Sequence, residues 1–153
     1  MPGVVSGLFV APEKGAPMQA LVEVRAVPGR GLEGDRYFSG NGTFTGDHRR
    51  DSEVTLMALE DLRAMERETG VTLAPGDMRR NVVTEGVDLR ALVGLEFNVG
   101  AVRLRATRLS EPCRHLARLT DERILKGLVH RSGLQVQVLT EGVVRVGDAI
   151  VMG

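Results

Sequence analysis

The sequence predicts a mostly β fold, a β-barrel with a few short helices, and three observations support this prediction. Glycine is abundant, at 19 of 153 residues, and aromatic side chains make up only 3% of the chain, a composition that suits short strands joined by tight turns. Roughly seven or eight short segments have the pattern of strands. Only one segment has a long helical pattern, and many short strands with few helices indicate a barrel.

The first third of the chain is expected to hold two strands and a long loop. Strands are predicted at residues 4–10 and 21–27, because the first is rich in apolar residues and the second alternates apolar with charged residues. Residues 29–46 contain six glycines and follow neither a helical nor a strand period. One long loop is therefore expected there, and structureless loops of this length often cover or bind a ligand.

The clearest helix is predicted at residues 58–69. Leu59, Leu62 and Met65 fall on one face of this helix, and Gly70 is a natural end for it. A short strand is expected just before the helix, at residues 53–56.

The second half of the chain is expected to be rich in strands. Its clearest strand covers residues 102–107, where Val102, Leu104 and Ala106 alternate with polar residues and face the core. The other elements are expected, in chain order, as a strand at 81–84, a helical turn at 89–93, a strand at 95–99, a loop at 110–113, helical patches at 115–119 and 124–129, a strand at 134–138 and a hairpin around 146–148.

Length, charge and cysteine content limit the functions that fit the chain. Its length suits one domain over residues 1–153. It has no apolar run long enough to cross a bilayer and no signal-peptide pattern, so a cytoplasmic location without membrane contact is expected. The 20 basic and 20 acidic residues balance, which gives no electrostatic case for nucleic-acid binding. A single cysteine excludes an intrachain disulfide and any zinc or iron–sulfur site built from several cysteines.

That single cysteine, Cys113, has basic surroundings in the sequence. The basic residues near it are Arg108, Arg114, His115 and Arg118. Glu111 is the only acid between residues 103 and 118. Nearby cations favour the thiolate, which can act as a nucleophile, carry persulfide sulfur or bind a metal such as molybdenum. The alternative is a small buried apolar side chain, which is the usual role of a lone cysteine in a cytosolic protein.

A second candidate segment consists of Arg79, Arg80 and Asn81, at the entrance of a predicted strand. Guanidinium groups and a carboxamide placed together can grip a phosphate or the edge of a pterin. Salt bridges at the surface are the alternative.

A third candidate pair, Asp35 and Arg36, follows Gly31 and Gly34. Glycines let backbone amides approach a ligand closely, so these polar residues are candidates for binding. A simple turn is the alternative.

Four motifs in this order resemble those of the MOSC domain family. They are GLEGDRY at residues 31–37, RRNVVTEG at 79–86, VRLR leading to EPC within 102–113, and GVVRVGD at 142–148. The resemblance spans most of the chain, and the third motif ends with the single cysteine.

This resemblance implies a β-barrel related to those of molybdenum-cofactor sulfurase C-terminal domains and amidoxime-reducing molybdoenzymes, and similar to the pyruvate-kinase barrel. It also implies that Cys113 is the catalytic residue, which ligates molybdenum or holds a persulfide. A molybdenum–pterin cofactor is therefore expected. The residues implied in cofactor binding are Arg79 and Asn81, with Arg80, Asp35 and Arg36 as further candidates in the same motifs.

The chain is expected to differ from both kinds of relative, which carry a further domain or region before the MOSC strands. No pyridoxal phosphate is expected, since neither Lys14 nor Lys126 lies in a context that suggests a Schiff base. Nothing in the sequence resembles a flavin, haem or iron–sulfur site. Electrons or sulfur are thus expected from a partner, either an electron-donor protein or a cysteine desulfurase.

Three functions fit these residues. The first is a molybdenum-cofactor enzyme that reduces N-hydroxylated small molecules. The second is a carrier of a Cys113 persulfide for metal–sulfur cofactor assembly, and the third is a binding module without catalysis. The first two use the same thiolate, so the sequence leaves them open. We expect the loop at 29–46, the strand entrance at 79–81 and the loop at Cys113 to meet around one pocket.

Overall fold

The computed structural model describes residues 3–12, 16–35, 53–70, 80–109 and 133–152. These residues form eleven strands, one α-helix and one 3₁₀ helix, which confirms the mostly β prediction. The elements before residue 70 are β1 (Gly3–Val10), β2 (Gln19–Leu21), β3 (Glu23–Val27), β4 (Gly31–Leu32), β5 (Val54–Ala58) and α2 (Leu59–Thr69). Those after residue 80 are β6 (Val82–Glu85), η2 (Leu89–Leu92), β7 (Glu96–Val99), β8 (Val102–Leu109), β9 (Leu134–Val138), β10 (Gly142–Arg145) and β11 (Ala149–Met152).

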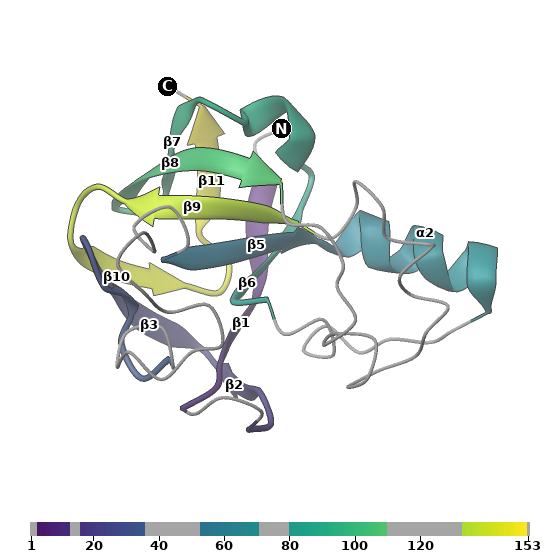
Figure 1. Ribbon diagram of the computed structural model, residues 1–153, viewed down its shortest axis with the longest axis horizontal. Coiled ribbons are helices and arrows are strands. Elements are labelled where there is room, and N and C mark those ends of the chain that lie inside the picture. The colour runs from purple at the N-terminus through teal and green to yellow at the C-terminus, as the bar shows by residue number, and fades with distance from the viewer. Residues whose placement is uncertain (1–2, 13–15, 36–52, 71–79, 110–132, 153) are drawn as a thin grey trace.

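Seven strands close into a barrel (Figure 1). Their order around the barrel is β11, β7, β8, β9, β5, β6 and β1, and the pairing of β1 with β11 closes the ring. Neighbouring strands are antiparallel except for β5 and β6, which are parallel. The register of β1 against β6 shifts between Val5 and Gly7, as at a β-bulge. Closure gives each barrel strand two partners, which removes the exposed edges of an open sheet.

A smaller sheet of β10, β3 and β4 accompanies the barrel, and it explains why two predictions are wrong. Residues 21–27 do not form one strand, because the chain passes at Val22 from β2 in the large sheet to β3 in the small one. The turn at 146–148 is not a hairpin, since β10 pairs with β3 whereas β11 pairs with β7 and β1. The chain passes between the two sheets at Val22 and again at Val146. These two points are in contact, since the N–H of Val146 donates to the carbonyl of Val22 at 3.0 Å.

The barrel core contains a row of apolar residues at one level, which we call the Leu134 row. Leu134 is opposite Leu109 on one side and Leu56 on the other. Leu56 is opposite Val82, and Val82 is opposite Leu8. Four of these residues are buried, and Leu109 packs against them. The row therefore links β8, β9, β5, β6 and β1, and its burial contributes to the main stabilising term of the fold.

Helix α2 contacts β5 and β6 on the outside of the barrel (Figure 1). Leu62 and Met65 of the helix are buried, as are Met57 and Val83, which do not belong to the core cluster inside the barrel. Gly70 ends the helix in the left-handed conformation, with φ of 74°, as the sequence predicts. The helix thus lies outside the barrel, next to the ends of the parallel strand pair.

Most other elements match the prediction within a residue or two. The strand predicted at 134–138 is β9, and the helical turn predicted at 89–93 is η2. No helix in the described ranges is long and apolar enough to span a membrane. The loop predicted at 110–113 and the helical patches predicted at 115–119 and 124–129 lie outside the described residues.

Candidate functional site

The structure describes three of the six residues that the sequence singled out. Asp35, Arg80 and Asn81 are described, whereas Arg36, Arg79 and Cys113 lie outside the described residues. Asp35 follows β4, and Arg80 and Asn81 directly precede β6. The described residues therefore include the start of the loop predicted at 29–46 and the entrance of β6, so the distance between these two parts can be assessed.

Asn81 is buried, with 1% of its surface exposed, and its carboxamide bonds to neighbouring strands. Its Oδ1 accepts hydrogen bonds from the N–H of Thr55 at 3.1 Å and from the Thr55 hydroxyl at 3.2 Å. Its Nδ2 donates to the carbonyl of Phe9 at 3.1 Å. Both lone pairs of the amide oxygen and one of the two Nδ2 hydrogens are thus used within the barrel.

Asp35 and Asn81 meet at the end of β1. The N–H of Phe9 donates to the carbonyl of Asn81 at 2.7 Å, and the N–H of Ala11 donates to Oδ1 of Asp35 at 3.0 Å. Asp35 is also 1% exposed. The structure therefore brings the start of the predicted loop and the strand entrance to the end of β1, where the Asp35 carboxylate accepts from the N–H of Ala11 and the Asn81 carboxamide donates to the carbonyl of Phe9.

Arg80 lies against the residue that precedes β9. Its side chain is partly buried, and its Nε would be 3.6 Å from a Cβ built on Gly133. That Cβ would also overlap the carbonyl oxygen of Leu56, and Gly133 has φ of +108°. Only glycine accommodates both the close approach and this backbone conformation. Gly133 thus lets β5, the start of β9 and Arg80 come together.

Residues 110–132, which contain Cys113, connect β8 to β9. The last residue of β8, Leu109, is opposite the first residue of β9, Leu134. The connection therefore leaves and rejoins the barrel on the Leu134 row. Val82 belongs to the same row and directly follows Asn81.

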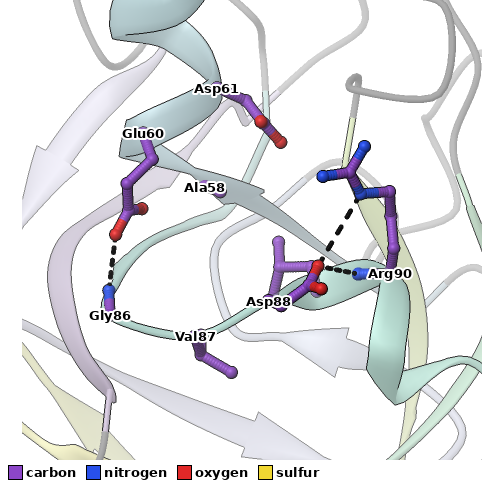
Figure 2. Close-up of a pocket in the computed structure, with 8 residues that line it drawn as sticks. Ala58, Glu60, Asp61, Gly86, Val87, Asp88 and Arg90 are labelled. Carbon is purple, nitrogen blue, oxygen red and sulfur yellow. Dashed lines mark hydrogen bonds and ion pairs between the residues drawn. The ribbon is translucent and has the colours of Figure 1, made fainter.

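A separate cavity of about 320 Å³ lies at the opposite ends of β5 and β6 (Figure 2). Its lining residues are Ala58, Glu60, Asp61, Gly86, Val87, Asp88, Leu89 and Arg90. Glu60 accepts a hydrogen bond from the N–H of Gly86 at 2.7 Å, and Asp88 pairs with Arg90 at 3.7 Å. This cavity is not lined by Asp35, Arg80 or Asn81. Within the described ranges, no group of three metal-binding side chains is found.

A family model for the MOSC domain matches residues 32–151. The chain belongs to the MOSC domain family. The match includes the turn at Asp35, the motif at residues 79–81 and Cys113. Within this MOSC domain, the candidate residues therefore all belong to the part of the chain that defines the family.

Solved structures support the MOSC fold over almost the whole chain. The YuaD protein from Bacillus subtilis has a TM-score of 0.84 at 18% identity, with 98% of this chain and 94% of that chain covered. YiiM from Geobacillus stearothermophilus has a TM-score of 0.77 at 17% identity, with 99% and 75% covered. YiiM from Escherichia coli has a TM-score of 0.70 at 19% identity, with 99% and 68% covered. No curated protein sequence matches the chain.

Two residues that organise this MOSC barrel, Thr55 and Glu53, are not among those predicted from the sequence. Glu53 is 5% exposed, and its Oε1 accepts hydrogen bonds from the N–H of Gly29 at 2.9 Å and of Val138 at 3.3 Å. It thereby joins the turn before β4 to the end of β9. Both missed residues are polar side chains at the start of an apolar strand, and such groups remain buried only where they find hydrogen-bond partners. A polar residue at the start of an otherwise apolar strand is thus the sequence signal that points to Thr55 and Glu53.

Proposed function

We propose that this MOSC domain binds a molybdenum–pterin cofactor through Cys113 and reduces N-hydroxylated small molecules with electrons from a partner protein. MOSC domains in general are linked to the molybdenum cofactor. One observation carries the proposal for this chain: Arg80 lies against Gly133, where the segment that contains Cys113 rejoins the barrel. A cationic residue of one motif is thus a neighbour of the segment that carries the thiol.

Chain length limits how far the other candidates can be from this point. Cys113 follows Leu109 by four residues, so their Cα atoms are within about 14 Å of each other. Arg79 is bonded to Arg80, which places their Cα atoms about 3.8 Å apart. These limits allow one ligand to meet both the thiolate and the guanidinium groups.

The chemistry of the residues fits such a cofactor. Arg79 and Arg80 offer guanidinium groups that bind a phosphate through two hydrogen bonds each. Cys113 offers a thiolate, a soft ligand suited to molybdenum. Asn81 fixes the entrance of β6 against Thr55, and we propose that its second Nδ2 hydrogen donates to the pterin.

Asp35 has a supporting role in this proposal. Its hydrogen bond to Ala11 fixes the turn at Asp35 at the end of β1, beside the Asn81 hydrogen bonds. Arg36 follows directly, and we propose that it adds a further positive charge toward the anionic cofactor. The backbone of this turn is thus held in place before the cofactor binds.

When bound, the molybdenum centre supplies two-electron exchange and an open coordination position. The reduction breaks the N–O bond of the substrate, consumes two electrons and two protons, and releases the reduced nitrogen compound and water. Cys113 holds the metal, and the arginines hold the anionic part of the cofactor. The two electrons come from the partner, which we propose is an electron-donor protein.

Molybdenum and pterin content tests the proposal after expression in a host that makes the molybdenum cofactor. The wild-type domain is expected to retain both, and Cys113→Ser is expected to lose molybdenum. Arg80→Gln is expected to lower the retained pterin roughly tenfold, because a charge-assisted hydrogen bond contributes about 1.5–3 kcal/mol. Arg63→Gln, on the exposed side of α2, is the matched control and is expected to retain both.

A reaction assay completes the test, with reduced methyl viologen as electron donor and benzamidoxime as substrate. Wild-type protein that contains cofactor is expected to form benzamidine, and Cys113→Ser is expected to form none. The proposal is overturned if the wild-type domain holds neither molybdenum nor pterin, or if Cys113→Ser retains both and remains active.

A further inference from the structure

The cavity between the start of α2 and the residues that follow β6 has no part in the proposed function. Its volume of about 320 Å³ is at the small end of the range of ligand sites, about 300–1,000 Å³. Ala58, Val87 and Leu89 give it an apolar wall, and charged side chains complete the lining. The cavity therefore suits a small molecule with a short apolar middle and polar ends.

Glu60 provides a carboxylate at one side of this cavity. Its Oε2 accepts a hydrogen bond from the N–H of Gly86 at 2.7 Å. Among the described residues, this is the only hydrogen bond that the Glu60 carboxylate accepts. Oε1 of Glu60 can therefore accept a hydrogen bond from a cationic group of a ligand.

Gly86 is the last residue of the motif at 79–86, and the proposed function uses only residues 79–81 of that motif. Gly86 has φ of 81°, a conformation that favours glycine. Its N–H fixes the Glu60 side chain across the cavity. The final glycine of the motif thus has a role in the cavity, because it holds the carboxylate in place before a ligand binds.

Arg90 provides a guanidinium at another side of the cavity. Oδ1 of Asp88 accepts a hydrogen bond from the backbone N–H of Arg90 at 3.1 Å and lies 3.7 Å from its Nε. Among the described residues, the two terminal nitrogens of Arg90 have no partner. The end of the guanidinium can therefore donate two parallel hydrogen bonds to a carboxylate.

Figure 2 shows Glu60 and Arg90 on opposite sides of the cavity, with Ala58 between them. We propose that this cavity binds an ω-amino acid, a small zwitterion with an amine at one end of a short aliphatic chain and a carboxylate at the other. The ammonium donates to Oε1 of Glu60, and the carboxylate accepts from the terminal nitrogens of Arg90. The aliphatic chain lies against Ala58 and Val87.

The placement of the two charged groups favours this class of ligand over three others. An anion alone would contact Arg90 but would gain nothing from Glu60, and a cation alone would gain nothing from Arg90. An α-amino acid carries both charges on one carbon and cannot extend between opposite sides. A metal ion is not favoured, since the described residues contain no group of three metal-binding side chains. Asp61 also lines the cavity but has another interaction, so we assign it no contact with the ligand.

Backbone amide shifts in NMR spectra of the whole chain test the site, with γ-aminobutyrate as the probe at pH 7. Butylamine and butyrate each carry one of its two ends, and glycine carries both charges on one carbon. We expect γ-aminobutyrate to shift the amides of Glu60, Gly86 and Arg90. It should bind roughly fivefold more tightly than each of the other three compounds, because one exposed charge pair contributes up to about 1 kcal/mol.

Two variants remove one charge each from the cavity. Glu60→Gln keeps an oxygen acceptor for Gly86, and Arg90→Gln removes the guanidinium, and each is expected to weaken γ-aminobutyrate binding roughly fivefold. Glu66→Gln and Arg63→Gln are the matched controls, since both residues are exposed on α2 and neither lines the cavity. The controls should bind like the wild-type chain, and thermal melting verifies that all variants are folded.

Four results would overturn the inference. The shifted amides could lie away from the cavity, or both cavity variants could bind like the wild-type chain. Butylamine, butyrate or glycine could bind as tightly as γ-aminobutyrate, or calcium chloride could shift the same amides at a lower concentration. The measurement needs neither molybdenum nor pterin, so its outcome is independent of the proposed function.

Discussion

Thr55 and Asn81 exchange hydrogen bonds in both directions, although 26 residues separate them in the sequence. The N–H and the hydroxyl of Thr55 both donate to Oδ1 of Asn81, and the N–H of Asn81 approaches Oγ1 of Thr55 at 3.0 Å. This pair joins β5 to the start of β6, where the two strands run parallel. It also fixes the point from which Arg80 emerges, so a structural contact positions a residue of the proposed site.

Removal of the Thr55 hydroxyl is expected to destabilise the barrel. Thr55→Val keeps the shape of the side chain but removes the two hydrogen bonds between its hydroxyl and Asn81, which together contribute about 1–3 kcal/mol, whereas the bonds between Asn81 and the Thr55 backbone remain. Urea unfolding measures this loss. Thr140→Val is the control, because the exposed hydroxyl of Thr140 accepts one hydrogen bond from Arg103 and its loss should cost less than about 0.5 kcal/mol. Equal effects of the two substitutions would contradict the role given to Thr55.

Glu53 is expected to stabilise the fold mainly through the hydrogen bonds that its Oε1 accepts, and less through its negative charge. Its Oε1 accepts hydrogen bonds from Gly29 and Val138, and a glutamine keeps an oxygen acceptor at this place. Glu53→Ala leaves two backbone donors without this acceptor and is expected to lower the free energy of unfolding by about 2–4 kcal/mol. Glu53→Gln is expected to lose less than half of that amount, and a loss as large as that of alanine would show that the negative charge is essential.

The sequence predicts the barrel and its strands well because those features follow from local patterns. The alternation in residues 102–107 and 134–138 reports directly which side chains face the core, and Gly70 reports the end of the helix. The passage of the chain between sheets at Val22 leaves no such local trace, since it depends on contact with Val146. For that reason the pairing of β10 with β3 could not be foreseen.

The polar residues of the motifs can be picked out from the sequence, but the contacts that they make cannot. The sequence identifies Asp35 and Asn81 as polar residues in motifs, and the structure brings both to the end of β1. Their oxygens accept from backbone and hydroxyl groups of partners that are distant in the sequence. Only the folded chain shows this, because a hydrogen-bond partner such as Thr55 has no motif of its own.

A methyl group at Gly133 is expected to disrupt the junction near Arg80. Gly133→Ala forces an L residue to φ of +108° and creates an overlap with the carbonyl of Leu56, so the loss of stability is expected to exceed about 2 kcal/mol. Gly70→Ala is the matched control, since Gly70 has φ of +74° but open space around it, and it should cost about 1 kcal/mol. Thermal melting of both variants compares them, and equal losses would show that the close approach at Gly133 is not restrictive.

Acid is expected to weaken the hydrogen bonds that Glu96 of β7 accepts from Arg105 and Arg103 of β8. Since Arg105 and Arg103 lower the pKa of Glu96 in the folded state, its contribution to stability is present above its ordinary pKa of 4.5 and is lost as the pH falls through the lowered value. Urea unfolding of the wild-type chain should therefore depend more on pH below about 5 than unfolding of Glu96→Gln does. In carboxyl NMR titrations, Arg105→Gln should raise the pKa of Glu96 more than Arg103→Gln does, and the reverse order would assign the stronger hydrogen bond to Arg103.

Alkylation of Cys113 tests whether its thiol is reachable and close to the guanidinium of Arg80. The thiolate is the reactive form, and a nearby positive charge increases its fraction at neutral pH. Arg80→Gln is therefore expected to lower the iodoacetamide rate at pH 7 severalfold, on the order of the effect of one partly screened charge. Arg63→Gln, on the exposed side of α2, should leave the rate unchanged. If wild-type Cys113 reacts only after unfolding in urea, the thiol is buried in apolar packing, and the shared site of Arg80 and Cys113 does not exist.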